Sequence, residues 1–289
     1  MTDRQDDFPY PLISTEELAA RLPGGDVRII DASWRMPGAG KAIDDHKKRR
    51  LPGAVFFDLD EIADKTTSLP HMLPKQDDFA RAVGALGVSE KDKVVVYDDA
   101  GLFSAARVWW TFRAMGHDAV SVLDGGLPKW LSENRPVESG LAAPAPTQYR
   151  PNAARNIARN ADDVRAMLKN KTGAVIDARP AARFRGEAPE PRAGLRSGRM
   201  PGALNVPHTA LLTQAGELAP PEILKARFEE AGLQKDGAII TSCGSGVTAA
   251  VLFLALERLG RGAVGLYDGS WTEWGDAAND PALFPAATG

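Results

Sequence analysis

Two halves of this chain carry the same ordered series of short sequence patterns, and this internal repeat limits the folds that are possible. The repeat is clearest when Asp99 is placed against Cys243, an offset of 144 residues. Small drifts in offset are what loop insertions produce, so we interpret the chain as two copies of one structural unit. At or near this offset, matching pairs include residues 105–106 with 249–250, Gly116 with Gly260, residues 124–125 with 268–269, Trp130 with Trp274, and, at 146, residues 31–32 with 177–178.

Within each half, short apolar segments alternate with segments of helical periodicity. Such alternation is typical of a parallel sheet with helices on both faces. We therefore expect an α/β fold of two domains, residues 1–150 and 151–289, with a Pro-rich linker at about residues 136–156. Ser14, with Glu17 three residues later, fits the start of the first helix. The predicted strands are residues 27–31, 93–97, 174–177 and 238–241, and the predicted helices are residues 15–22 and 161–169.

Composition excludes several classes of protein. The chain has 289 residues and a formal net charge of −3, a balance that argues against a nucleic-acid partner. Its one cysteine cannot form an intrachain disulfide or a multi-cysteine metal site, and it fits a reducing compartment. The first ten residues lack the apolar core of a secretory signal, and the longest apolar run, residues 248–256, is about half a membrane span. We expect a cytoplasmic protein with no membrane partner.

Cys243 lies where a predicted strand ends and a Gly-rich loop leads into a predicted helix. Gly244 and Gly246 allow the backbone to take positive φ, so that several N–H groups can point at one atom. The N-terminus of the following helix adds a positive potential, and both effects favour a thiolate over a thiol. A buried structural cysteine is the alternative interpretation. Because ligands of parallel sheets bind beyond the carboxyl ends of the strands, we favour a reactive nucleophile.

With these residues in view, the chain resembles the tandem-domain sulfurtransferases of the rhodanese superfamily, and among them the subgroup that acts on 3-mercaptopyruvate. The most specific element is the loop CGSGVTA at residues 243–249. The resemblance implies two rhodanese-like domains, of which only the second carries the nucleophile, and Asp99 in place of Cys243 in the repeat agrees with this. Supporting blocks are residues 51–60, 71–74, 107–117, 123–130, 183–192, 201–207 and 267–274.

The resemblance also implies a two-step sulfur relay. The Cys243 thiolate would take sulfur from 3-mercaptopyruvate as a persulfide, release pyruvate, and pass the sulfur to thioredoxin, a small thiol or cyanide. Backbone N–H groups of the loop would stabilise negative charge on sulfur. No metal or organic cofactor is implied, and we expect a monomer. The loop residues are Gly244, Ser245, Gly246, Val247 and Thr248.

By the same resemblance, Arg183 and Arg192 occupy the positions that bind the donor. Arginine suits this role because its planar fork grips a carboxylate with two hydrogen bonds. Arg185, Arg196 and Arg199 lie nearby and could be confused with them, since most arginines in such a stretch are solvated.

The family further suggests that Ser245 joins His71 and Asp60, both from the first half, in a relay that assists proton transfer. For His71 a structural or exposed role is the alternative. For Asp60 it is a loop carboxylate, and Asp58 lies only two residues away. Thr248 is expected to cap the helix that follows the loop or to donate to the loop, a structural role more than a chemical one.

Three other functions stay open. A thiosulfate sulfurtransferase would use the same nucleophile, but relatives acting on this dianion typically carry basic residues where this chain has the neutral Gly244 and Ser245. A cysteine phosphatase or arsenate reductase would need an arginine six positions after the cysteine, where Ala249 stands. A binding module without activity would not need Cys243.

Overall fold

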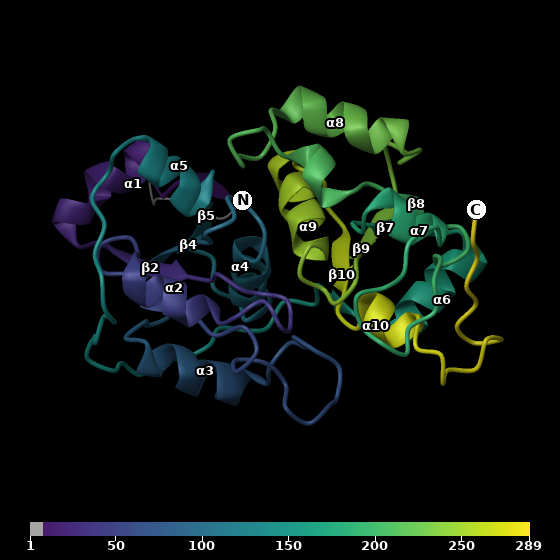
Figure 1. The fold of residues 1–289 in the computed structure, drawn as a ribbon, viewed down its shortest axis with the longest axis horizontal. Helices are drawn as coiled ribbons and strands as arrows, with labels where there is room; N and C mark the ends of the chain where they lie inside the picture. The colour runs from purple at the N-terminus through teal and green to yellow at the C-terminus, as the bar shows by residue number, and fades with distance from the viewer. Residues whose placement is uncertain (1–7) are drawn as a thin grey trace. The chain divides into compact units, whose positions relative to one another are not determined.

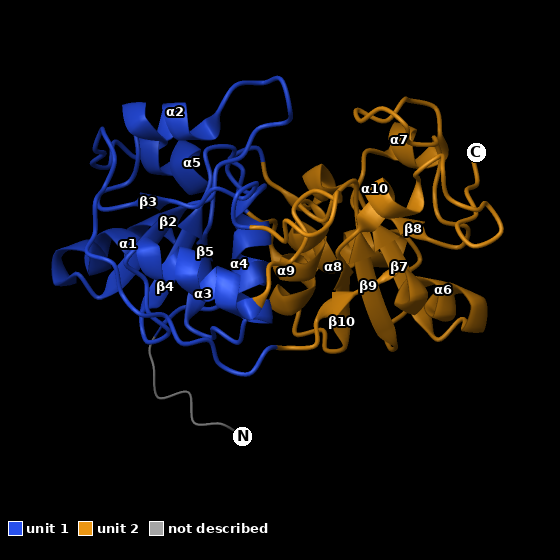
Figure 2. Ribbon diagram, turned by 90° about the horizontal axis from the view of Figure 1, so that it is seen from below, with its two compact units in different colours: residues 1–62, 76–154, 214–217 blue, residues 63–75, 155–213, 218–289 orange. Residues whose placement is uncertain are grey.

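The computed structural model describes residues 8–289; residues 1–7, the start of the segment considered above as a secretory signal, lie outside the described residues. The chain forms two compact units (Figure 2). Unit 1 holds residues up to 62 together with 76–154 and 214–217, and unit 2 holds residues 63–75, 155–213 and 218–289. Two short segments, 63–75 and 214–217, therefore belong to the unit formed mainly by the other half of the sequence.

Unit 1 is built on a parallel sheet in the order β1-β5-β4-β2-β3. The strands β2, β4 and β5 are labelled in Figure 1. Its strands are β1 Leu12–Ile13, β2 Val27–Asp31, β3 Val55–Phe56, β4 Lys93–Tyr97 and β5 Val120–Leu123. Its helices are α1 Thr15–Arg21, the 3₁₀ turn η1 Leu22–Gly24, α2 Ala42–Lys48, α3 Gln76–Ala85, α4 Ala105–Ala114 and α5 Gly126–Ser132.

Unit 2 repeats this arrangement with a parallel sheet in the order β6-β10-β9-β7-β8. Its strands are β6 Ala158–Arg159, β7 Gly173–Asp177, β8 Leu204–Asn205, β9 Ala238–Ser242 and β10 Val264–Tyr267. Its helices are α6 Ala161–Asn170, α7 Ala181–Arg185, the 3₁₀ turn η2 His208–Leu211, α8 Pro221–Glu230, α9 Ala249–Arg258 and α10 Ser270–Trp274.

The predicted α/β fold is confirmed, and the predicted strands agree with the structure to within one residue. The predicted start of the first helix is also confirmed, because Ser14 and Glu17 form a reciprocal capping box. Its predicted end is one residue too late. The helix ends at Arg21, and Leu22 opens a 3₁₀ turn that has a proline in its first positions.

Each sheet is covered on both faces, as the burial of alternate strand residues shows. In unit 1, Ile29 and Val95 pack with Leu18 of α1 and Trp130 of α5. Val96 points to the opposite face, because successive side chains alternate, and it is also fully buried. A parallel sheet must bury both faces in this way, so only the two ends of its strands can hold a site.

The predicted linker, residues 136–156, contains no helix or strand but is not a free tether. The Thr147 N–H donates to the Gly84 carbonyl at 2.8 Å, and Tyr149 is buried. The Tyr149 hydroxyl lies 3.1 Å from His117 Nδ1. The segment up to about residue 152 is therefore packed onto unit 1.

The longest apolar run of the sequence forms much of α9, which directly follows the Cys243 loop. This helix is buried on every side from Ala249 to Leu256. It has ten residues, and across residues 8–289 no helix combines the length and the apolar character that crossing a bilayer requires.

Candidate functional site

The cysteine predicted as nucleophile lies directly beyond the carboxyl end of β9, between β10 and β7 of the unit 2 sheet. Cys243 is 2% exposed. Its N–H donates to Ser270 Oγ at 3.2 Å, and its carbonyl accepts from the Trp271 N–H at 2.9 Å. The Gly244 carbonyl accepts from the Thr272 N–H at 2.8 Å. The first residues of α10 therefore hold the backbone on which the thiol is mounted.

The loop after Cys243 presents backbone N–H groups that are not used elsewhere. Within residues 8–289, the N–H groups of Gly244, Ser245, Val247 and Thr248 donate no hydrogen bond. Gly246 has a φ of 77°, the left-handed conformation that lets a loop curl around one atom. Such an array of donors beside a buried sulfur can stabilise negative charge on it.

In unit 1, the corresponding loop binds the carboxylate of Asp98 through its backbone N–H groups. The Asp98 carbonyl accepts from the Leu127 N–H at 2.9 Å, as the Cys243 carbonyl accepts from Trp271. The buried Asp98 carboxylate accepts three backbone N–H bonds, from Ala100 at 3.0 Å, Phe103 at 2.7 Å and Ala105 at 2.8 Å. The loop of unit 1 therefore surrounds a negative charge at the position that the thiol has in unit 2.

The sequence alignment of Asp99 with Cys243 is therefore wrong by one residue. In the sheets, Asp31 pairs with Tyr97 and Asp177 pairs with Ser242. The residue after each of these strand ends is Asp98 in unit 1 and Cys243 in unit 2. The unit 1 loop is one residue longer before its helix begins, and the offset of 144, which matches the two helices, hides this insertion.

Burial raises the pKa of Asp98 to about 6 from an ordinary 3.8, in spite of its three backbone donors. Because the folded state binds the proton more tightly, Asp98 contributes stability that is full below about pH 4 and is lost as the pH rises through about 6. We expect the difference in free energy of unfolding between wild type and Asp98→Asn to fall by roughly 2 kcal/mol from pH 4 to pH 7. Urea titrations at several pH values would measure it, and a difference that does not change with pH would contradict it.

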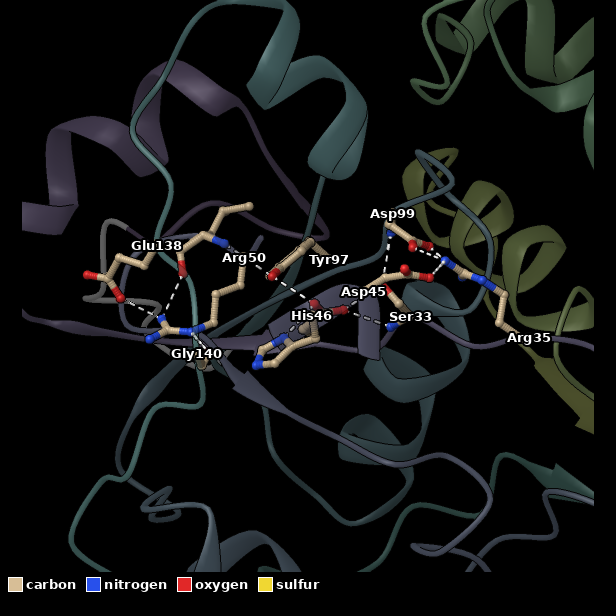
Figure 3. Close-up of polar contacts among 11 residues, drawn as sticks. Ser33, Arg35, Asp45, His46, Arg50, Tyr97, Asp99, Glu138 and Gly140 are labelled. Atoms are coloured by element: carbon tan, nitrogen blue, oxygen red, sulfur yellow. Dashed lines mark hydrogen bonds and ion pairs between the residues drawn. The ribbon is translucent and has the colours of Figure 1, made fainter. Parts of the chain in front are cut away.

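Unit 1 carries an ion pair and a buried contact between a carboxyl group and an imidazole ring at this end of its sheet. Arg35 faces Asp99, with Nη1 2.9 Å from Oδ1 (Figure 3). The buried Asp31 lies 2.8 Å from His46 Nδ1. These four side chains help to line a cavity of about 650 Å³. Since Cys243 is the single cysteine of the chain, unit 1 has no thiol nucleophile.

Arg183, on α7, lies against the Cys243 loop within unit 2. A Cβ added to Gly244 would be 3.3 Å from Arg183 Nη2. The predicted positive φ is confirmed for Gly246 but wrong for Gly244, which is absent from the positive-φ residues of the described chain. A side chain at position 244 would be in tight contact with the Arg183 guanidinium. The structure thus brings a cation next to the loop that carries the buried thiol.

The other arginines of this segment have different surroundings. Arg192 is half-buried in the turn after α7. Arg185 is exposed and pairs with Glu187, with Nε 2.7 Å from Oε1. Arg196 Nη2 donates at 2.8 Å to backbone carbonyls at the C-terminal end of α10 and near the chain end, and Arg199 stacks over a phenylalanine ring. Arg185, Arg196 and Arg199 therefore have structural contacts, whereas Arg183 lies beside the loop.

His71 lies in the segment 63–75, which packs with unit 2 although the sequence places it in the first half. It is 4% exposed and has a φ of 62°. Two residues later, the Leu73 N–H donates to Asp268 Oδ2 at 2.7 Å. Asp268 follows β10, the neighbour of β9. The His71 segment is therefore anchored at the carboxyl ends of the strands, where Cys243 also lies.

The structure separates the roles of Asp58 and Asp60. Asp58 Oδ1 accepts from the N–H groups of Asp60 and Glu61, so Asp58 is the loop carboxylate. The exposed Asp60 accepts from Trp34 Nε1 through Oδ2 at 3.0 Å, within unit 1.

In unit 2, Ser245 is buried two residues after Cys243. Thr248 stands at the N-cap position of α9, but the prediction that it caps the helix is wrong for its side chain, which makes no cap hydrogen bond.

Sequence reasoning missed two buried charged side chains that are linked to the site, those of Arg179 and Glu190. Arg179, two residues after the strand-end Asp177, is 1% exposed. Its guanidinium lies 4.1 Å from the ring of Trp271, and Glu190 joins it to Arg183. The sequence block at 183–192 contains Glu190, but pattern alone does not show which charges are buried. Within the described residues, no group of three or more His, Cys, Asp or Glu could hold a metal ion.

Both halves of the chain match the rhodanese-like domain family, over residues 14–133 and 160–277. The chain is 43% identical over 286 residues to thiosulfate/3-mercaptopyruvate sulfurtransferase 1, mitochondrial, of Arabidopsis thaliana, covering 91% of this chain and 76% of the relative. It is 43% identical over 274 residues to 3-mercaptopyruvate sulfurtransferase of Escherichia coli (strain K12), covering 93% and 96%. The crystal structure of SseA from Escherichia coli, a 3-mercaptopyruvate sulfotransferase, is similar with a TM-score of 0.82 and 41% identity over 91% of this chain and 99% of that chain.

Proposed function

The chain belongs to the rhodanese family of sulfurtransferases, with two rhodanese-like domains in tandem, and on this premise we propose that it transfers sulfur from 3-mercaptopyruvate through a persulfide on Cys243. The observation that carries the proposal is the buried thiol of Cys243, set among unused backbone N–H groups with the Arg183 guanidinium beside the loop.

In the first step, the Cys243 thiolate attacks the sulfur of the donor. An S–S bond forms and the donor's C–S bond breaks. The electron pair of that bond goes to carbon as the enolate of pyruvate, which takes up a proton. Negative charge lies on the Cys243 sulfur before the attack and on the persulfide after it, and the loop N–H groups favour it there. Arg183 would bind the carboxylate of the donor, with Arg192 as a second candidate.

In the second step, an acceptor thiolate or cyanide attacks the outer sulfur, and the Cys243 thiolate leaves. We propose a thioredoxin-type thiol as the acceptor, and a relay of Ser245, His71 and Asp60 for the protons. The anchoring of the His71 segment to Asp268 supports this role for His71. We also propose a monomer that works in the cytoplasm without a cofactor.

Thiosulfate is the second candidate donor, because the name of the Arabidopsis relative includes both donors. In this chain, the two residues after Cys243 are the neutral Gly244 and Ser245. A cation must therefore come from elsewhere, and Arg183 already shares its charge with Glu190. These features favour a monoanionic keto acid over a dianion.

Intact mass after incubation with 3-mercaptopyruvate tests the proposal. We expect the wild-type chain to gain one sulfur atom and to lose it again when a thiol is added. The Cys243→Ser variant, treated in the same way, should gain nothing. A wild-type chain of unchanged mass would refute the persulfide mechanism.

A further inference from the structure

Four charged side chains near the Cys243 loop form a chain of contacts. In order, they are Asp177, Arg179, Glu190 and Arg183. Arg179 Nη2 lies 2.8 Å from Asp177 Oδ2, and Arg179 Nη1 lies 2.7 Å from Glu190 Oε1. The other oxygen of Glu190 accepts from Arg183, from Nε at 3.1 Å and also from Nη2. Glu190 thus bridges an arginine that belongs to the core and an arginine that faces the site.

Burial differs sharply along this chain of contacts. The side chains of Asp177, Arg179 and Glu190 are each 1% exposed, whereas that of Arg183 is 23% exposed. Three of the four charges are therefore away from water, and Arg183 is the member that a ligand can reach.

The four charges sum to zero, two carboxylates against two guanidiniums. Burial alone would lower the pKa of Arg179, but the charges of Asp177 and Glu190 and their hydrogen bonds outweigh it and raise this pKa. Arg179 therefore stays cationic, and its charge is already balanced by Asp177. Glu190 is left to balance Arg183.

The same network also touches the loop that carries the thiol. The Arg179 guanidinium lies 4.1 Å from the ring of Trp271, and the backbone N–H of Trp271 donates to the Cys243 carbonyl. Arg183 Nη2 would be 3.3 Å from a Cβ on Gly244. Glu190 therefore affects the site through Arg183, the cation that lies beside the loop.

We propose that Glu190 determines donor specificity: by balancing the charge of Arg183, it leaves a site that accepts a monoanionic keto acid and disfavours a dianion such as thiosulfate. The proposal rests on the function proposed above. Two N–H groups of Arg183 are held by Glu190, and the remaining ones are left to grip a carboxylate. A dianion would bring one more negative charge toward the Glu190 carboxylate, and specificity is set by such unfavourable contacts as much as by favourable ones.

The test compares two variants of the same residue. Glu190→Gln keeps the shape and one acceptor but removes the charge, whereas Glu190→Asp keeps the charge but shortens its reach. We expect Glu190→Gln to raise the ratio of kcat/KM for thiosulfate to kcat/KM for 3-mercaptopyruvate by about tenfold, or about 1.4 kcal/mol. Glu190→Asp should lower both kcat/KM values and leave their ratio within about twofold of wild type.

This ratio is independent of the active enzyme concentration, so partial unfolding of a variant does not obscure it. An unchanged ratio in Glu190→Gln, or an equal shift in Glu190→Asp, would overturn the proposal and leave Glu190 a structural residue. The wild-type mass experiment separates the two hypotheses. If wild type gains sulfur from 3-mercaptopyruvate and the ratio does not move, only the specificity role fails.

Discussion

Replacing Cys243 by serine is expected to lower the steady-state release of pyruvate from 3-mercaptopyruvate by about 10⁴-fold or more, the scale seen when a covalent nucleophile is removed. A serine hydroxyl has a far higher pKa than a thiol and cannot hold a persulfide. The loop N–H groups, Arg183 and the rest of the site stay in place, so the loss measures the nucleophile itself. Stopped-time assays of pyruvate would quantify it.

The control for Cys243→Ser is a measurement showing that the variant keeps its fold. The side chain is small and 2% exposed, so the urea midpoint of the variant should stay close to that of wild type. If pyruvate release persisted within tenfold of wild type while the fold was retained, the sulfur would not pass through Cys243. Another mechanism of transfer would then be needed.

Replacing Arg179 by leucine is expected to lower the free energy of unfolding of unit 2 by about 3–5 kcal/mol, because two buried carboxylates lose their shared partner. Asp177 and Glu190 are each 1% exposed in their side chains, and neither can reach water to recover its solvation. The stacking of Arg179 on Trp271 is lost as well. Urea titration of the whole chain, followed by circular dichroism, measures the change.

Arg185→Leu is the control for the buried network. Arg185 also pairs with a glutamate, Glu187, but the two side chains are 46% and 54% exposed. An exposed pair of this kind contributes about 0–1 kcal/mol, so this variant should be nearly as stable as wild type. Equal losses in the two leucine variants would show that burial of the network does not matter.

Much of the fold could be predicted from the sequence because its signals are local. Apolar β-branched runs such as residues 93–97 form the strands where expected, and the Ser14 and Glu17 pair starts α1 as a capping box. One error fell where a single residue of loop length mattered. The helices after the two loops align at 144, but the strand ends align Asp98 with Cys243, and no local pattern reveals this insertion.

Only part of the candidate site could be predicted from the sequence. The resemblance marked Arg183 among several arginines, and the approach of its Nη2 to Gly244 supports that choice. Glu190 lay in the same sequence block without a role. Its function depends on which charges are buried together, and burial is a property of segments that meet only after folding. In the sequence alone, a carboxylate such as Glu190 in an arginine-rich segment is typical of a solvated surface.

The sequence by itself determined that the chain is a duplicated α/β unit with one thiol, placed where a strand gives way to a Gly-rich turn. Periodicity and order carry that information, since the strands and helices depend mainly on neighbouring residues. Tertiary structure alone decided three things: that Asp98 is the counterpart of Cys243, that the His71 segment packs with unit 2, and that Glu190 balances Arg183. Each depends on contacts between segments that are distant in sequence or on a register across a sheet, which packing selects and local pattern does not encode.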